Sequence, residues 1–361
     1  MTDVRGTNAD LAALWIWFAD TAGRGYSPIY DRVCRAVATN DEVLALVQAA
    51  PARSHQPNVL LAAVHYLLLG GLEHPMAAVY AGTSDTDPGP LFIDVCLTHR
   101  AEISDLLATR HTNTNEVGRS APVGLALTAV AQRLGAPLAL VDVGCSAGLN
   151  LLCDQYRLDY GTAGATGPAD AAITVECVVT GRDAPVAPQL PSIVERVGID
   201  LDPVDVTDPD QRRWQFALVF PDTNRLPRTR RALEAIARTP PRIVRGDAVD
   251  TIGPVVLELR PDAVAVVTTT WAAAYFAQER RVEFRERLAE ISRRRPVAWI
   301  SAEGPGVVDL FADVEVPSDE AGTQASVLGL ARFEQGETTA ELLGFVHPHG
   351  SWVDWRAHET K

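Results

Sequence analysis

The sequence predicts an α/β protein in which an all-helical N-terminal domain precedes a mostly parallel, seven-stranded sheet with a C-terminal antiparallel hairpin. Residues 1–135 carry apolar residues at helical spacing, without an alternating strand pattern. From about Leu138, short β-branched runs alternate with helical segments, which is typical of a parallel sheet with crossover helices. The run SVLGLARFEQGETTAELLGFVHP has the pattern of two strands joined by a turn at Gln335-Gly336-Glu337.

The predicted helical domain covers residues 1–135. Breakers such as Ser27-Pro28 and His74-Pro75 divide it into separate helices. Its strongest helical segments are LAALWIWFAD, DEVLALVQAA, NVLLAAVHYLLLGG and LFIDVCLTHRAEISDLLATR. Their apolar residues predict a helical core.

The predicted sheet domain covers residues 136–361. Five apolar runs predict its parallel strands, namely LALVDVGC, RVGID, PRIVRGD, DAVAVVTTTW and PVAWISAEG. Helices are predicted at Ala147–Tyr156, Asp208–Ala237 and Glu279–Arg294. Residues 157–195 are longer than a usual connection, so we interpret them as an insertion, with a hairpin expected around AAITVECVVTG.

Composition narrows the class of protein. The chain has 361 residues, of which 47% are hydrophobic and 22% charged, and no apolar stretch is long enough to span a membrane. A net charge of −14 disfavours nucleic acid and anionic membranes as partners. The five cysteines lack CxxC spacing and their number is odd, which disfavours a disulfide framework or a zinc site. The N-terminal residues lack the pattern of a secretory signal, so we expect a cytoplasmic protein.

A glycine-containing turn follows the first predicted strand. The residues of interest are Asp142, Gly144, Ser146 and Gly148, in the order D-x-G-x-S-x-G. A turn that feeds a strand into a helix lets a ligand approach the backbone, where free N–H groups favour an anionic group. An ordinary tight turn without a ligand would have the same local sequence.

An acid follows the second predicted strand, at Asp200 in GIDLDP. A carboxylate at this position can accept both ribose hydroxyls of a nucleoside ligand. Asp200 lies 52 positions after Gly148, a separation that the insertion would explain. Asp159 is a rival, 17 positions after Asp142, but its surroundings fit a strand end less well.

The glycine turn resembles the first motif of class I S-adenosylmethionine-dependent methyltransferases, with Ser146 in place of the middle glycine. GIDLDP is similar to the second motif of these enzymes. The segment around Asp247 is similar to their third motif, in which an acid or the neighbouring backbone contacts the adenine amino group. The resemblance implies a Rossmann-like fold and S-adenosylmethionine as cofactor. Each acid alone could also be a helix N-cap.

Nearly the whole chain resembles a bacterial family known as domain of unknown function 2332. The resemblance rests on SPIY, QPNVLLAAVHYLL, TNTNEVGR, VDVGCSAGLNLLCDQYRLDYG, RVGIDLDPVDV and the GDA segment. It implies a methyltransferase-like fold and no particular substrate.

The acceptor of a methyl group is expected beyond the fourth predicted strand, near Trp271 and Tyr275. Both residues could equally be core aromatics. The Asn/Asp-Pro-Pro-aromatic motif of methyltransferases that act on amino groups is absent, which lowers that substrate class.

A dense polar run, TRHTNTNEVGR, occupies residues 109–119 before the first predicted strand. A helix entering there would place Asn115 and Arg119 on one face, with Glu116 beside them and Arg110 just before. These groups could orient a hydroxyl or carboxylate acceptor. Glu116 is our first candidate for a general base and Glu303 the second; simple N-capping is the alternative.

The function that these patterns predict is methyl transfer from S-adenosylmethionine to a small-molecule acceptor, at oxygen or a carboxylate. A non-catalytic, nucleoside-binding regulatory protein is an alternative. A nicotinamide-dependent oxidoreductase is less favoured, because the middle glycine and a clear Tyr-x-x-x-Lys pair are missing. His347 and His349 alone do not make a metal site, so no metal is expected.

Overall fold

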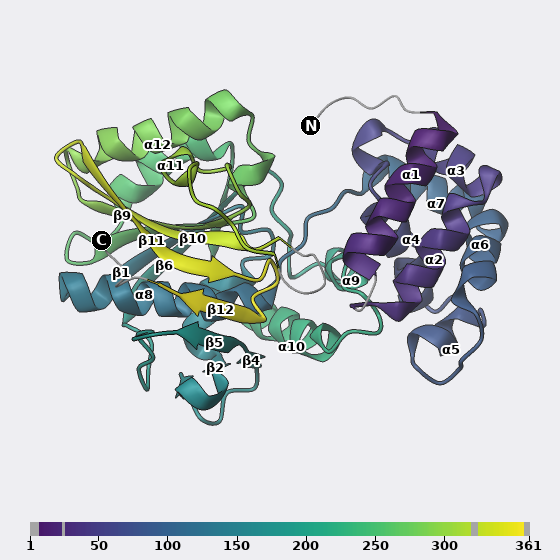
Figure 1. Ribbon diagram of the computed structural model, residues 1–361, viewed down its shortest axis with the longest axis horizontal. Helices are drawn as coiled ribbons and strands as arrows, with labels where there is room; N and C mark the ends of the chain where they lie inside the picture. The colour runs from purple at the N-terminus through teal and green to yellow at the C-terminus, as the bar shows by residue number, and fades with distance from the viewer. Residues whose placement is uncertain (1–6, 24–25, 319–323, 357–361) are drawn as a thin grey trace. The chain divides into compact units, whose positions relative to one another are not determined.

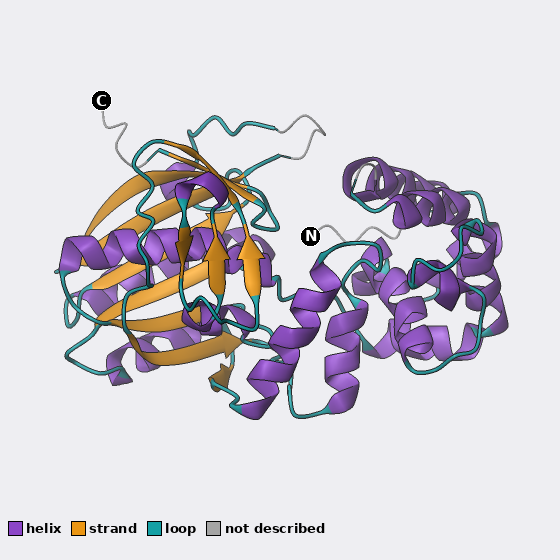
Figure 2. Ribbon diagram, turned by 90° about the horizontal axis from the view of Figure 1, so that it is seen from below, coloured by secondary structure: helices purple, strands orange, loops and turns teal. Residues whose placement is uncertain are grey.

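The computed structural model of the chain describes residues 7–23, 26–318 and 324–356. The chain forms two compact units, and it passes between them three times. The first unit contains residues 1–114 and 207–230, and the second contains residues 115–206 and 231–361. Figure 2 shows that the strands of the described residues all belong to the second unit, whereas the first is built from helices.

The first unit is a set of helices around an apolar core that includes Trp15, Tyr30 and Leu60. Side-chain caps define several helix starts, because the first backbone N–H groups of a helix lack partners. Ser27, for example, accepts a hydrogen bond from the Tyr30 amide. The α-helices lying wholly in this unit are α1 (Asn8–Phe18), α2 (Pro28–Ala38), α3 (Asp41–Gln48), α4 (Pro57–Leu69), α5 (Met76–Tyr80), α6 (Pro88–Thr98), α7 (Arg100–Thr109) and α9 (Pro209–Ala217).

Residues 207–230 return to the first unit from the second. Trp214 and Phe220 of this segment join the core of the first unit. Asp222 accepts hydrogen bonds from the Ser27 hydroxyl at 2.5 Å and from the Ile29 amide at 2.9 Å, so it stabilises the N-terminus of α2. The predicted helix 208–237 is therefore two helices, α9 and α10 (Arg225–Arg238), and α10 crosses from the first unit to the second.

The second unit contains a nine-stranded sheet, with the spatial order β5-β12-β11-β10-β9-β8-β1-β6-β7. The strands from β7 to β9 are parallel, and β10, β11 and β12 follow in antiparallel pairing. The strands of this sheet are β1 (Leu138–Val143), β5 (Val178–Gly181), β6 (Ile193–Asp200), β7 (Arg242–Arg245), β8 (Val264–Thr270), β9 (Val297–Glu303), β10 (Ser326–Glu334), β11 (Glu337–Val346) and β12 (Trp352–Trp355).

The sequence prediction of an α/β fold with a mostly parallel sheet is confirmed, and the predicted number of seven strands is wrong. The two additional strands are β12 and β5, which pair with each other in parallel. The predicted hairpin in the insertion is also wrong, because β4 (Thr174–Glu176) pairs with β2 (Arg157–Asp159) in a small separate sheet that also contains β3 (Ala165–Thr166). Such remote pairings leave no local signal in the sequence.

Helices cover both faces of the large sheet. Figure 1 shows α11 (Ala248–Glu258) and α12 (Gln278–Ser292) on one face and α8 (Ser120–Leu134) on the other. The central strands are buried on both sides, which explains why they appear as continuous apolar runs rather than alternating patterns. The predicted helical domain includes residues 120–134, whereas α8 packs against the sheet.

Short 3₁₀ turns connect several of these elements. They are η2 (Ala52–Ser54), η3 (Val117–Arg119), η4 (Leu149–Gln155), η5 (Gly161–Ala163), η6 (Ala273–Tyr275) and η7 (Asp309–Phe311), and η1 (Ala19–Gly23) is a π turn. The helix predicted at Ala147–Tyr156 is the 3₁₀ segment η4, which has non-helical backbone angles at Leu152. None of the helices in the described ranges has the length and apolar character needed to cross a membrane.

Candidate functional site

The strand order of the sheet identifies where a ligand is expected. From β1 the chain proceeds to β6 and β7 on one side, and then to β8 and β9 on the other. The order therefore reverses between β1 and β8. In open α/β sheets, ligands bind beyond the carboxyl ends of the strands at such a point. We call the edge where β1, β6, β8 and β9 end the carboxyl edge.

Asp142 lies on β1 at this point of reversal and is paired in register with Thr268 of β8. Its carboxylate is buried and accepts a hydrogen bond from the Thr268 hydroxyl at 2.7 Å. Burial raises the pKa of Asp142 to about 7; the Thr268 hydrogen bond opposes this shift, the charge of Asp200 adds to it, and that of Arg119 opposes it. Asp142 can therefore gain or lose its proton near neutral pH.

The turn after β1 has an unusual backbone. Gly144 and Gly148 have φ angles of 71° and 78°, and Ser146 has φ of 52°. A Cβ atom on Gly144 would lie 2.4 Å from the Cβ of Ala272, so only glycine fits both the backbone angle and the space. A serine in this backbone region costs conformational energy, which the surrounding contacts must offset.

Asp200 holds this turn in place. Its Oδ2 accepts a hydrogen bond from the Ser146 amide at 2.7 Å, and its Oδ1 accepts one from the Asp202 amide at 2.8 Å. An ionised carboxylate has about four acceptor sites, so both oxygens retain capacity for hydroxyl groups of a ligand. Leu201, the next residue, is 71% exposed and presents an apolar surface beside this acid.

The rival acid Asp159 lies elsewhere. It belongs to β2 of the small sheet and accepts a hydrogen bond from the Gly161 amide at 2.9 Å. The glycine turn, in contrast, follows a strand of the large sheet that is paired directly with the strand of Asp200. The structure therefore brings Asp200, and not Asp159, into hydrogen-bond contact with the turn.

Asp247 is the N-cap of α11. It accepts a hydrogen bond from the Val249 amide at 2.9 Å, and it forms an ion pair with Arg280. The neighbouring Gly246 amide donates to the Asp200 carbonyl at 2.9 Å, so the segment lies beside the end of β6. The carboxylate of Asp247 itself is engaged in capping and in an ion pair.

The polar run before β1 is divided between the two units. Arg110 lies in the first unit, where it pairs with Asp210 and where its guanidinium is 5.8 Å from the ring centroids of both Tyr66 and Trp214. The helix predicted to begin near Asn115 is wrong, because residues 110–116 are not helical and α8 begins after η3, at Ser120. The proposed helical face therefore does not exist.

The rest of this run frames the carboxyl edge. Asn115 accepts a hydrogen bond from the Leu149 amide at 2.6 Å, just after the glycine turn. Arg119 donates to the Thr270 carbonyl at the end of β8, at 3.0 Å, and to the Pro348 carbonyl at 2.9 Å. Buried Glu116 accepts from the Gly118 amide at 2.7 Å. The contacts of Asn115 and Arg119 link the segment to backbone groups just after the glycine turn, on β8 and in the loop before β12.

Glu303, at the end of β9, organises the segment after β8. Its buried carboxylate accepts hydrogen bonds from the amides of Ala272 at 3.0 Å, Ala273 at 3.1 Å and Ala274 at 3.3 Å. Burial raises the pKa of Glu303, against the effect of these three bonds. Because Ala272 packs on Gly144, Glu303 positions the wall of the glycine turn.

The two aromatic candidates differ in their surroundings. Trp271 has a positive φ of 55°, and its indole N–H donates to the Ser326 hydroxyl at 2.8 Å. Tyr275 is 68% exposed. Trp271 is therefore held at the carboxyl edge by side-chain and backbone contacts, whereas the Tyr275 side chain is open to solvent.

Comparison with known protein families identifies the family of this chain. Residues 12–355 match the family described as "Uncharacterized protein conserved in bacteria (DUF2332)". The chain belongs to the DUF2332 family. No curated protein matches the chain. The match extends through both units of the DUF2332 chain, so it covers the glycine turn and every other residue of the candidate site.

At the candidate site of this DUF2332 chain, both predicted bases are hydrogen-bonded to the backbone. Glu116 and Glu303 both accept backbone N–H groups, and the thiol of Cys145 within the turn is neutral, because burial raises its pKa well above the usual range. Sequence reasoning missed Leu201 and the contact of Ala272 with Gly144. The position of Leu201, an apolar residue between two acids just after a strand, is a signal that the local sequence contains. The contact of Ala272 with Gly144 is tertiary and leaves no local signal.

Proposed function

We propose that this chain binds S-adenosylmethionine at the carboxyl edge and transfers its methyl group to a small-molecule acceptor, at oxygen or a carboxylate. The observation that carries the proposal is the hydrogen bond from the Ser146 amide to Asp200. It joins the glycine turn after β1 to an acid at the end of the adjacent strand, and these two elements hold the nucleoside and the anionic part of a ligand in doubly wound sheets.

The order of the parallel strands supports this proposal. Numbered by their own succession in the chain, β7, β6, β1, β8 and β9 follow the order 3-2-1-4-5. This is the beginning of the Rossmann order 3-2-1-4-5-6. The chain departs from that order at β10, which lies beside β9 but runs antiparallel to it.

Different residues of the carboxyl edge suit different parts of the ligand. Backbone N–H groups of the glycine turn suit the carboxylate of the amino acid part, and Asp200 suits the ribose hydroxyls. Leu201 offers an apolar surface for the purine. Asp247 is engaged with Arg280, so in this proposal the adenine amino group is met by backbone near Gly246 rather than by that carboxylate.

The sulfonium of the bound cofactor supplies an activated methyl group, so the chain contributes mainly positioning. Glu116 and Glu303, the two candidates for a general base, are hydrogen-bonded to backbone amides. An acceptor that arrives already ionised needs no base. We therefore favour a carboxylate acceptor over an alcohol, with Arg119, which donates to the Thr270 carbonyl at the end of β8, as the cation.

A nucleoside-binding protein without catalysis is a second candidate. The engagement of both predicted bases, Glu116 and Glu303, with backbone amides favours it. Only turnover distinguishes this candidate from the first, because the binding contacts would be the same.

Calorimetric titration of the full chain tests the proposal. S-adenosylhomocysteine should bind with a Kd of about 10 µM or tighter, and NAD at least about thirtyfold more weakly. Equal binding of both, or of neither, contradicts it. Incubation with methyl-labelled S-adenosylmethionine and a panel of small carboxylic acids and alcohols then separates the two candidates, since only an enzyme transfers the label.

A further inference from the structure

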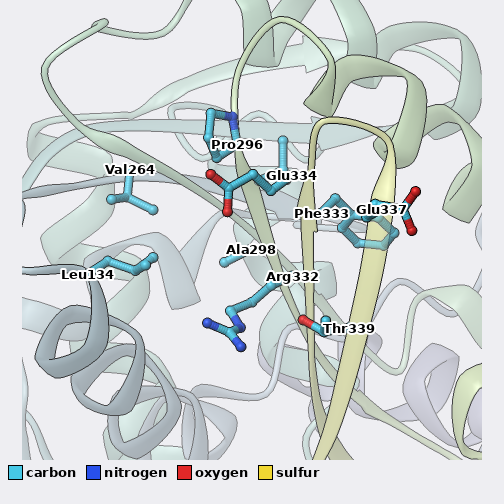
Figure 3. A pocket seen from close by; sticks show the side chains of 10 residues that line it. Leu134, Val264, Pro296, Ala298, Arg332, Phe333, Glu334, Glu337 and Thr339 are labelled. Carbon is cyan, nitrogen blue, oxygen red and sulfur yellow. The ribbon is translucent and has the colours of Figure 1, made fainter.

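A cavity lies at the opposite end of the sheet from the candidate site. Its volume is about 270 Å³, close to the lower end of the range for small-molecule pockets. It lies where β8 and β9 begin and where β10 ends, which we call the amino edge (Figure 3). The lining residues used below are Leu134, Val264, Pro296, Ala298, Arg332 and Glu334.

Two opposite charges face this cavity without neutralising each other. Arg332 and Glu334 are both exposed, and within the described part of the chain neither has an ion pair. Figure 3 shows the Arg332 guanidinium and the Glu334 carboxylate at two ends of the same open space. On the same face of the hairpin, Arg133 and Glu341 form a bidentate pair at 2.5 and 2.7 Å, so pairing is available nearby and is not made here.

The strand geometry places both charged residues on one face of the sheet. Arg332 and Glu334 are two positions apart on β10, so they project from one face of the sheet with Cα atoms about 6.8 Å apart. Phe333, between them, packs into the core on the other face. A molecule with a carboxylate and an ammonium about 3 Å apart can bridge the two side chains through one charge-assisted hydrogen bond of about 2.8 Å at each end.

Apart from Glu337 and Thr339, the remaining lining residues are apolar. Leu134, at the end of α8, is 41% exposed, and Val264 lies beside it in Figure 3. Pro296 and Ala298, before and within β9, add to this surface. An aliphatic side chain would cover these groups and remove apolar area from water.

We propose that the cavity at the amino edge binds a free aliphatic α-amino acid, with its carboxylate on Arg332, its ammonium on Glu334 and its side chain against Leu134 and Val264. The proposal does not depend on the function proposed for the carboxyl edge. Each charged group of the ligand meets the opposite charge, and its apolar part meets apolar walls.

Titration of the full chain with L-valine, L-leucine and L-isoleucine tests the proposal. At least one should bind saturably, at one site per chain, with a Kd of about 1 mM or tighter. For L-leucine as the binder, 4-methylpentanoate and 3-methylbutylamine, which each lack one charge, should bind at least about tenfold more weakly. Absence of saturable binding of all three amino acids, or equal binding of an analogue with one charge, overturns the proposal.

Three matched variants locate the site. Arg332→Gln and Glu334→Gln should each weaken amino-acid binding at least about tenfold, whereas Glu337→Gln should change it less than about threefold. Glu337 also lines the cavity, but its carboxylate points away from the open space in Figure 3. All three side chains are exposed, so the variants should fold normally. An equal loss with Glu337→Gln contradicts the proposal.

A competition experiment separates this inference from the proposed function. S-adenosylhomocysteine also carries an α-amino acid group, so competition with the amino acid would assign both ligands to one site and overturn the inference. We expect no competition, and we expect Asp200→Ala to leave amino-acid binding unchanged, because Asp200 lies at the carboxyl edge. Failure of S-adenosylhomocysteine to bind would contradict the proposed function alone.

Discussion

Charged side chains at the carboxyl edge and at the amino edge of the sheet differ in their bonding and exposure. At the carboxyl edge, Asp200, Glu303 and Arg119 are each bonded to backbone amides or carbonyls. At the amino edge, Arg332 and Glu334 are exposed and make no ion pair within the described ranges. A ligand at the carboxyl edge therefore meets groups that are already fixed, whereas a ligand at the amino edge must order long side chains, at a cost in entropy. Tight, geometry-dependent binding is expected at the former and weaker binding at the latter.

The largest effect that the comparison predicts is at Asp200. Asp200→Ala removes a charged acceptor from two ribose hydroxyls and from the Ser146 amide, so S-adenosylhomocysteine affinity should fall about a hundredfold, or about 3 kcal/mol. Titration calorimetry measures the change.

Two variants control this experiment. Asp159→Ala removes an acid whose carboxylate, among the described residues, hydrogen-bonds within its own local turn, so affinity should stay within about threefold. Asp200→Asn keeps one acceptor oxygen, so its affinity for S-adenosylhomocysteine should lie between those of Asp200→Ala and Asp159→Ala. If Asp159→Ala proves the more damaging change, the nucleoside site has been assigned to the wrong strand.

Gly144 tests whether the glycine turn is fixed by packing as well as by backbone conformation. Gly144→Ala would place a Cβ against Ala272, whereas Gly135→Ala meets nothing within 4 Å, at a similar φ of 64°. The free energy of unfolding should fall by about 2 kcal/mol more for Gly144→Ala than for Gly135→Ala. Chemical denaturation measures both; equal losses would mean that the turn yields to the extra atom.

Asp142 gives the carboxyl edge a pH dependence. Its folded-state pKa of about 7 exceeds the ordinary value of 3.8, so the folded protein retains a proton that the unfolded chain has already lost between these values. Its contribution to stability is therefore greatest at low pH and falls as the pH rises to about 7. The free energy of unfolding of the wild type, minus that of Asp142→Asn, should fall by more than about 1 kcal/mol from pH 4 to pH 7 and then level off. Parallel curves for the two proteins would contradict this assignment.

Asp247 should show the smallest effect on the ligand. Because it caps α11 and pairs with Arg280, Asp247→Ala should lower the free energy of unfolding by about 1 kcal/mol and change S-adenosylhomocysteine affinity less than about threefold. Melting curves and calorimetry on the same preparation provide both values. A tenfold loss of affinity would indicate that the Asp247 carboxylate contacts the adenine amino group.

Local sequence predicted the parallel core well, because strands covered by helices on both faces appear as continuous apolar runs. It missed α11, a helix that contains Gly253 and Pro254, residues that usually interrupt helices. It also missed β12 and the pairing of β5 with β12, because residues so far apart in the chain give no periodic signal.

The candidate site was predictable where a residue type and a strand end coincide. Asp142 and Asp200 follow apolar runs, and the structure brings both to the point where the strand order reverses. The roles of Glu303 and Arg119 depend on backbone groups of distant segments, such as the Ala272 amide and the Pro348 carbonyl. Such partners are fixed by tertiary packing, which a pattern of residue types along one segment does not encode.

The most direct test of the central claim is amide hydrogen exchange of the full chain with and without S-adenosylhomocysteine. The account predicts slower exchange in peptides that cover residues 142–149 and 198–204, and unchanged exchange in residues 330–340 at the amino edge. Unchanged exchange in the first two segments, or protection confined to residues 330–340, would contradict the claim that the carboxyl edge binds the cofactor.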